Sequence, residues 1–207
     1  WIVVSGALVN FNLYAISAFF AAFLTRFHAF SVAEAGLFAG IGSGAAGLLG
    51  GVAAGAWGDR RPHAAGRLHS ASMAALAAAP VALAGILAPP GEAARAVVGV
   101  MAAYGLLNMY YGLVYSAIQD LVGPQLRGTA MAVYFMAMYL CGAAFGPLLT
   151  GRLSDVLARR ALEAGAAAEA ARAIGLHQAM YVIPVLSLAL ALALWAGSRA
   201  EHSGRKQ

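Results

Sequence analysis

The chain contains 207 residues, of which 62% are hydrophobic and only 10% are charged, and its formal net charge is +5. In a soluble domain about one quarter of the residues are charged, so this composition argues against a soluble domain and indicates a membrane protein. The arginines are scattered over short loops and the tail without interleaved aromatic residues, so we expect no nucleic-acid partner.

Apolar segments predict an all-α, polytopic membrane protein with six transmembrane helices. Each segment is long enough, at about 1.5 Å per residue, to cross a hydrocarbon core of about 30 Å. A Ser31–Glu34 capping box is predicted to open the second helix. The longest connection, 152–175, is rich in Ala, Glu and Arg, and we expect a short surface helix there. The predicted helices are 1–24, 35–57, 69–88, 96–119, 128–150 and 176–198.

A short motif recurs in the two halves of this pattern. The second predicted helix ends in Gly55-Ala-Trp-Gly-Asp59, and the fifth ends in Gly151-Arg-Leu-Ser-Asp155. Both read Gly-x-x-small-Asp, at the same place in two successive units of three helices. Because each unit has an odd number of spans, the second unit must be inverted relative to the first. Inverted three-helix repeats are typical of secondary transporters.

Polar residues line one face of the first helix of each unit. In the fourth segment they are spaced i, i+4, i+7 and i+11, which is one narrow helical face at about 100° per residue. Unpaired hydroxyls and amides are costly in hydrocarbon, so this face should meet other helices or a water-filled solute pathway. Both alternatives stay open, and we favour the pathway. The predicted cavity residues are Asn10, Tyr14, Ser17, Tyr104, Asn108, Tyr111, Tyr115 and Gln119.

The loop after the second helix carries a family resemblance. Gly55-Ala-Trp-Gly-Asp59-Arg60-Arg61 resembles the G-x-x-x-D-R signature of the major facilitator superfamily, although Pro62-His63 replaces the Gly-Arg-Arg that usually follows. The segments 124–132 and 142–155, with His177-Gln178, look like the corresponding regions of spinster-like members.

The resemblance implies that the chain is the C-terminal six-helix half, helices seven to twelve, and that an N-terminal half completes the transporter. Starting at Trp1 without Met or a signal peptide, the sequence is expected to be a piece of a longer protein. Lys and Arg divide almost evenly between the two sides, so charge does not decide orientation. The resemblance implies a cell inner (plasma) membrane location with a cytoplasmic C-terminus, and an amphiphilic, lipid-like solute.

The same resemblance suggests a set of gating residues. Gly55 would permit close helix contact, Asp59 would accept from helix amides or a neighbouring Arg, and Arg60 would stay at the headgroups. The full set is Gly55, Asp59, Arg60, Arg127, Gly151 and Asp155.

No acidic residue lies in the middle of a predicted span. If transport is coupled to protons, the coupling acid is expected in the other half, or Asp120 at the cavity mouth assists. The five histidines fall in or next to loops without metal-ligand spacing, so we expect no metal and no cofactor.

Two other function classes remain. Gly42-Ser43-Gly44 and His177 could belong to an intramembrane serine protease, which needs Ser and His within hydrogen-bond reach. The glycines are more simply helix-contact residues, so we expect no enzyme. A six-helix channel or scaffold is the third class.

Overall fold

The computed structural model describes residues 1–204, and every regular element in this range is a helix. The fifth span is made of four consecutive elements: η1, α5, the π-helical turn η2 and α6. Two more, α7 and α8, share the last span, so the described chain has six helices of membrane-spanning length and composition. In chain order the elements are α1 (Ile2–His28), α2 (Val32–Gly58), α3 (Ala64–Ile86), α4 (Ala93–Leu121), η1 (Pro124–Leu126), α5 (Arg127–Met138), η2 (Tyr139–Ala143), α6 (Phe145–Glu163), α7 (Ala168–Ala179) and α8 (Val182–Gly204).

The first turn between helices is set by local chemistry. α1 ends where Ala29 adopts a left-handed conformation, with φ of 58°. The predicted capping box then opens α2: the Ser31 hydroxyl accepts from the Glu34 N–H at 3.2 Å, and the Ser31 N–H donates to Glu34 Oε2 at 3.0 Å. These bonds satisfy N–H groups that a helix start otherwise leaves unpaired.

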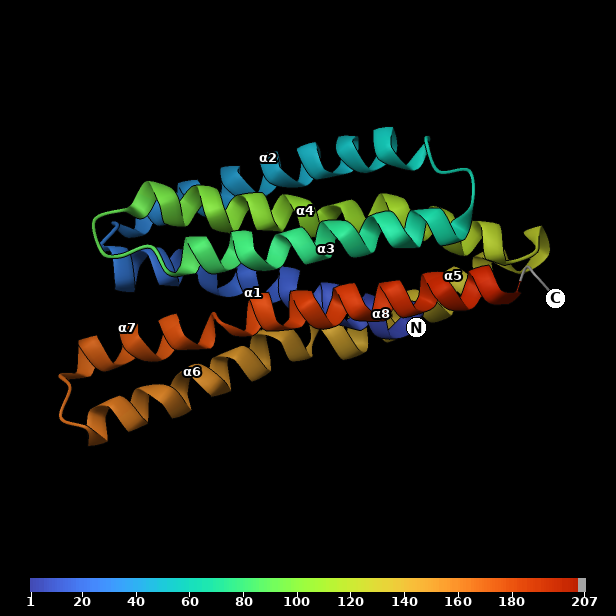
Figure 1. Ribbon diagram of the computed structural model, residues 1–207. Coiled ribbons are helices and arrows are strands. Elements are labelled where there is room, and N and C mark those ends of the chain that lie inside the picture. Colours follow the sequence, from blue (N-terminus) through green and yellow to red (C-terminus); the bar gives the residue numbers. More distant parts are fainter. Residues whose placement is uncertain (205–207) are drawn as a thin grey trace.

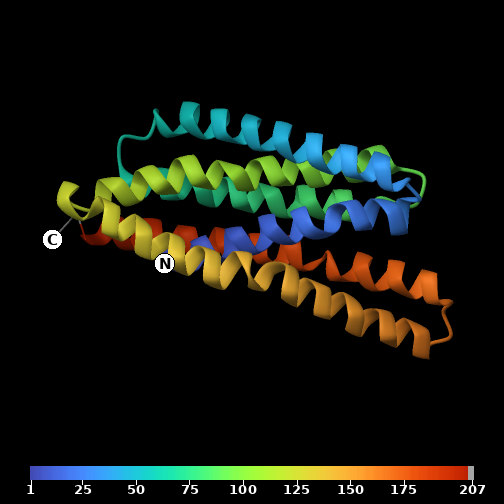
Figure 2. The same ribbon diagram turned by 180° about the vertical axis from the view of Figure 1, so that it is seen from behind.

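The two three-helix units interlock. α1 packs on α8 and on the η2 and α6 part of the fifth span, whereas α4 packs on α2 and α3. Thus the first helix of each unit lies between the second and third helices of the other unit. α3 and α8 lie side by side and come forward in Figure 1. α1, α4 and α5 come forward in the opposite view of Figure 2. The predicted fold class, two inverted three-helix repeats, is confirmed.

Glycine makes the closest of these contacts possible. A Cβ atom added at Gly50 of α2 would lie 2.2 Å from the Gly105 carbonyl oxygen of α4. Real Cβ atoms do not approach so closely, so α2 and α4 meet backbone to backbone, as small residues allow in membrane helices. By contrast, a Cβ atom at Gly55 would meet no atom of the described residues within 4 Å. Gly55 therefore makes no such close contact among the described residues, and its role as a gating residue stays a prediction.

The connection 152–175 differs from the prediction. Instead of a separate surface helix, α6 continues to Glu163 and α7 begins at Ala168. Figure 1 shows this hairpin extending beyond the other helix ends. The segment contains no proline and many alanines, which are the best helix formers, so both spans simply lengthen. Asp155 consequently lies inside α6 rather than at a helix end.

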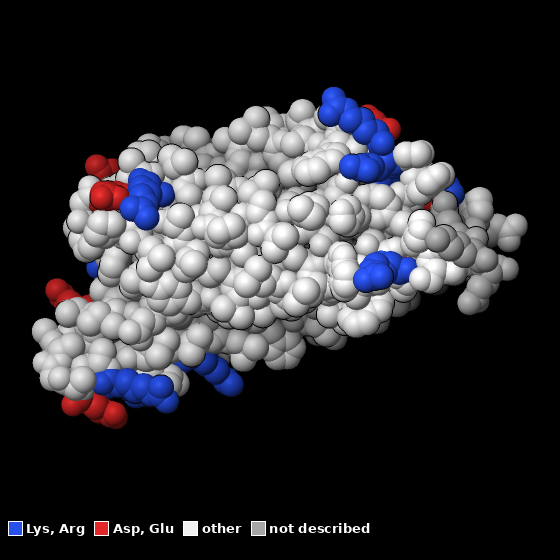
Figure 3. All heavy atoms as spheres, in the orientation of Figure 1, with Lys and Arg blue, Asp and Glu red and all other residues white. Residues whose placement is uncertain are grey.

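Charged side chains gather at the two ends of the bundle on the face that Figure 3 shows. A broad uncharged band separates them, as expected where a protein meets hydrocarbon. With six apolar spans, the arrangement is that of an integral membrane protein. α2 and the fifth span are the least buried, so the bundle leaves its two second helices open on their outer faces.

Candidate solute-binding face

The polar faces of α1 and α4 meet through one hydrogen bond. The Tyr111 hydroxyl donates to Asn10 Oδ1 at 2.6 Å, and Asn10 is fully buried. The Asn10 Nδ2 group has no hydrogen-bond partner among the described residues. A buried amide with unused donors is costly. Because Asn10 is 0% exposed, a ligand could accept from it only after a rearrangement opens this contact.

Tyrosine rings extend this contact into one cluster. Tyr14 of α1 meets Tyr139 edge-on at 6.3 Å between ring centroids, and Tyr111 lies 5.4 Å from Tyr115. Tyr104 is half-buried and lies about two helical turns before Tyr111 on the same face of α4. Through Tyr139 and Phe135, ring contacts link Tyr14 of α1 to Tyr115 and Tyr111 of α4. Tyr14 is 40% exposed, so the cluster reaches the surface of the bundle.

The remaining predicted cavity residues lie at the margin of this cluster. Asn108 is half-buried and donates from Nδ2 to the Tyr104 carbonyl oxygen at 2.9 Å, one turn back along α4. Ser17 and Gln119 are exposed, and no side-chain hydrogen bond among residues 1–204 joins either to the tyrosines. The structure thus gathers the central members of the predicted face and leaves its two ends apart.

A buried hydroxyl chain that was not predicted supports the cluster from behind. The Tyr110 hydroxyl lies 2.8 Å from Ser5 Oγ and 2.7 Å from the Tyr134 hydroxyl. The chain ties α1, α4 and α5 together at a fully buried position. Tyr110 sits beside Tyr111 in the sequence but about 100° away on the helix, outside the predicted polar face. Its partners are distant in the sequence, so no local pattern indicates it.

The π-helical turn η2 lies next to the Asn10–Tyr111 contact. Here the Ala144 N–H bonds to the Tyr139 carbonyl oxygen at 3.1 Å, five residues back. A Cβ atom at Gly142 would lie 2.7 Å from the Asn10 Cβ. The widened turn therefore presses its backbone against α1 while Tyr139 joins the ring cluster. Single π-turns inside α-helices are frequent at functional sites.

An ion pair joins two helices at the end of the bundle near Asp59, but its residues lie outside the predicted gating set. Arg67 of α3 donates to Asp120 of α4 at 2.5 Å. Asp59 ends α2, and the described residues offer its side chain no hydrogen-bond partner. Arg60 is exposed, and Arg127 donates only to the nearby Val122 carbonyl oxygen at 3.3 Å. The contact that joins two helices at this end is thus Arg67–Asp120.

The second motif lies towards the other end of the bundle. Gly151 packs against Phe19 of α1, where a Cβ atom would lie 3.2 Å from the ring, and Asp155 is exposed one turn further along α6. The two motif aspartates therefore do not meet, as the inversion of the units requires.

We expect Asp120→Asn to lower the free energy of unfolding by about 0.5–1 kcal/mol, because a partly exposed ion pair is worth about that much. The Arg67 and Asp120 side chains are 19% and 38% exposed. The measurement is a double-mutant cycle with Arg67→Gln, read by thermal unfolding. The matched control is the more exposed pair Arg95–Glu92, at 3.1 Å, for which we expect less coupling. Equal coupling energies in the two pairs would contradict the expectation that the less exposed pair contributes more to stability.

The fold defines a class: one half of a major facilitator transporter fold. The sequence matches no protein-family model and no curated protein. Its fold is similar to two crystal structures of a bacterial homologue of the human lysosomal transporter Spinster. The inward-facing, occupied form matches with a TM-score of 0.78 and 24% identity, over 96% of this chain and 48% of that one. The inward-facing, unoccupied form matches with 0.75 and 25% identity, over 96% and 47%.

The chain thus spans about half the length of the solved structures it matches. The resemblance to spinster-like transporters, predicted from Gly55–Arg61 and the later segments, is confirmed at the level of the fold.

Proposed function

We propose that this chain is the C-terminal six-helix half of a secondary active transporter that moves a small amphiphilic or lipid-like solute by alternating access. The observation that carries the proposal is the contact between Asn10 and Tyr111, which joins the polar faces of two inverted first helices. In transporters of this architecture, binding sites lie near the bilayer midplane at the interface of repeats.

The chemistry of the face suits an amphiphile. Tyrosine offers a flat apolar ring together with a hydroxyl. Here ring contacts connect Tyr14, Tyr139, Tyr115 and Tyr111, and Tyr104 lies on the same face of α4. Asn10 Nδ2, which has no hydrogen-bond partner among the described residues, would provide a polar anchor beside the rings once the Asn10–Tyr111 contact opens to the solute. A sugar would require a denser set of hydrogen-bonding groups than this face provides.

The outer faces of α2 and the fifth span support a second half as partner. They are the least buried parts of the bundle, and the similar structures are about twice as long as this chain. A partner bundle packed there would enclose the tyrosine face and could rock against this one, exposing the solute to each side in turn. Membrane lipids cover the remaining surface.

Proton coupling, if present, requires a carboxylate outside this face. α1 contains no acidic residue, and the only one in α4 is Asp120, which is paired with Arg67. We therefore place the coupling acid in the N-terminal half. A cell inner (plasma) membrane location and a cytoplasmic C-terminus also belong to the proposal, and a reporter fused after Gln207 would test the latter.

The protease alternative gains no support from the geometry. The Ser43 hydroxyl donates to the Gly40 carbonyl oxygen at 3.1 Å, within its own helix. His177 Nε2 instead contacts the Ile86 carbonyl oxygen at 2.9 Å, and its ring stacks on Phe27 with centroids 4.2 Å apart. Each group is used structurally. Covalent labelling of Ser43 by a serine-reactive phosphonate would support the protease alternative.

The deciding experiment is uptake into liposomes that contain the complete protein. A carrier gives saturable uptake of lysophospholipid or sphingoid-base analogues and exchange of labelled for unlabelled solute. A channel gives flux that does not saturate, and a scaffold gives none. Absence of saturable uptake and of exchange for every amphiphile tested would refute the carrier.

A further inference from the structure

An apolar groove runs between α3 and α8 on the face of Figure 1, away from the tyrosine cluster. Its floor is made of small residues, where Ser72 Oγ donates to the Ala191 carbonyl oxygen at 2.7 Å and both residues are buried. Larger exposed side chains form the walls, and the groove has a volume of about 510 Å³. The walls are Met73, Leu76, Leu188, Leu192 and Trp195.

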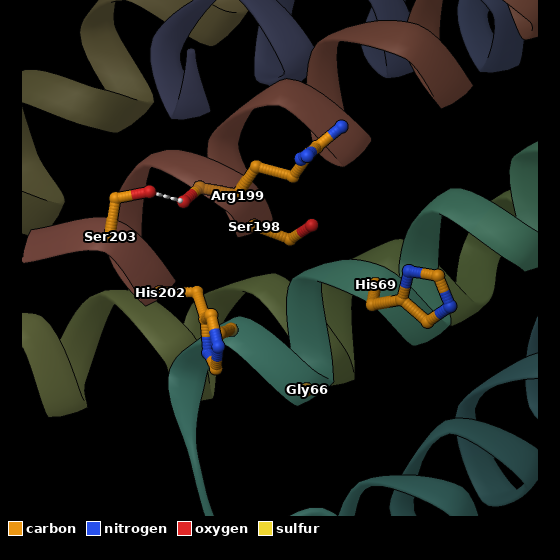
Figure 4. A pocket seen from close by; sticks show the side chains of 7 residues that line it. Gly66, His69, Ser198, Arg199, His202 and Ser203 are labelled. Atoms are coloured by element: carbon orange, nitrogen blue, oxygen red, sulfur yellow. Dashed lines mark hydrogen bonds between the residues drawn. The ribbon is translucent and has the colours of Figure 1, made fainter. Parts of the chain in front are cut away.

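A polar hollow of about 490 Å³ continues this groove at the end of the bundle, with His69 common to both. Figure 4 shows His69 on α3 and Ser198, Arg199 and His202 on α8 around the opening. The Arg199 guanidinium lies 4.8 Å from the Trp195 ring centroid, so it is held over the junction of the two hollows. The surface therefore changes from apolar to cationic within about one helical turn.

We propose that this continuous surface, the α3–α8 groove, binds one anionic phospholipid of the surrounding bilayer. An acyl chain would lie along the Leu76 and Leu192 walls, and the phosphate would accept from Arg199 and from the imidazoles of His69 and His202. Neither α1 nor α4 contributes a lining residue, so the site is independent of the proposed solute face.

Charge complementarity identifies the occupant. The adjoining hollow is lined by Arg60, Arg61 and His63, with Glu201 as the acidic residue. Together with Arg199, three arginines outnumber Glu201 and Asp59, which precedes Arg60 in the sequence, so the region keeps an excess of positive charge. Basic groups at the membrane surface attract anionic lipids.

The position of Trp195 also favours a lipid. Tryptophan is enriched where hydrocarbon meets headgroups. Trp195 marks this level at the end of the apolar groove, and Arg199 lies one helical turn, about 6 Å, further out. The phosphate level of a bilayer is expected there. A soluble anion would not need the apolar walls, and a partner helix would not need the cationic end.

The test is native mass spectrometry of the complete protein with equal amounts of phosphatidylglycerol and phosphatidylcholine of identical chains. We expect the wild type to retain one phosphatidylglycerol with a preference of about fivefold for each basic group involved. Arg199→Gln with His69→Gln should bind one phosphatidylglycerol fewer. Arg172→Gln, which removes an exposed charge on α7 at the opposite end, is the control and should behave as wild type.

Three outcomes of the mass spectrometry would overturn the proposal. They are equal retention of the two lipids by the wild type, equal loss in Arg172→Gln, and displacement by millimolar inorganic phosphate, which would indicate a soluble anion. A photo-crosslinker at Leu192 adds an independent readout, since it should capture phosphatidylglycerol. Capture of a protein chain there would show that the groove is an interface instead.

Discussion

Gly50→Ala is expected to destabilise the bundle strongly, although it adds a single methyl group. The new Cβ would lie 2.2 Å from the Gly105 carbonyl oxygen and 3.2 Å from the Asn108 Cβ. Neither a carbonyl of a packed helix nor a Cβ can move aside as the end of a flexible side chain can. Overpacking a close contact costs about 1–3 kcal/mol, and the backbone partner here places the change at the upper end of that range. The measurement is thermal unfolding of the purified protein, read by tryptophan fluorescence.

The adjacent residue provides the matched control. A Cβ atom at Gly51 would meet nothing within 4 Å among the described residues. Gly51→Ala should therefore leave the stability unchanged or raise it by up to about 1 kcal/mol, since alanine is the better helix former. Equal destabilisation by both substitutions would mean that α2 is sensitive to any added volume, and that the α2–α4 contact is not special.

The contrast between these glycines illustrates what the sequence could predict. Apolar length predicts six spans, and the Ser31–Glu34 pattern predicts where α2 begins, because both depend on residues that are close along the chain. Glycine, however, only permits close contact. Whether Gly50 or Gly51 makes the close contact depends on which face of α2 packs against α4. That face is decided by the packing of the helices and cannot be read from composition.

The polar face shows the same division between local and distant information. Helical spacing places Tyr104, Asn108 and Tyr111 on one side of α4, and the structure does bring Tyr111 onto Asn10 of α1. The spacing does not indicate that Tyr110 bonds to Ser5 and Tyr134, because those residues lie on other helices. Nor does it reveal that Arg67, eight residues after Asp59, supplies the ion pair at that end.

Interlocking of the two units has a mechanical consequence. Because α1 lies between helices of the second unit and α4 between helices of the first, neither unit can move alone without breaking these contacts. The six helices should therefore act as one rigid body in the proposed transport cycle. Rocking against a second bundle then becomes the simplest way to expose the tyrosine face alternately to the two sides.

Asn108→Leu and Tyr115→Phe are expected to impair transport while leaving the bundle folded. Asn108 donates from its amide to a carbonyl oxygen of its own helix. Among residues 1–204, the Tyr115 hydroxyl makes one weak hydrogen bond, to Met138 Sδ at 3.8 Å. Neither polar group therefore makes a strong hydrogen bond to another helix. Leucine is close in size to asparagine, so it should fit the Asn108 position beside α2. Losing one hydrogen bond of about 0.5–1.5 kcal/mol should raise the KM of uptake by about two- to tenfold. The change in unfolding temperature should be small.

Tyr110→Phe supplies the opposite result and so tests the assignment. It removes the hydroxyl that connects Ser5 with Tyr134 at a buried position, which should cost about 1–3 kcal/mol of stability because both partners lose a bond. The KM of the folded fraction should stay close to the wild-type value, since Tyr110 lies behind the ring cluster. If Tyr110→Phe raises the KM as much as Tyr115→Phe does, the solute contacts a different face of α4. If Asn108→Leu lowers stability rather than transport, the polar stripe is helix packing and the proposed pathway is refuted.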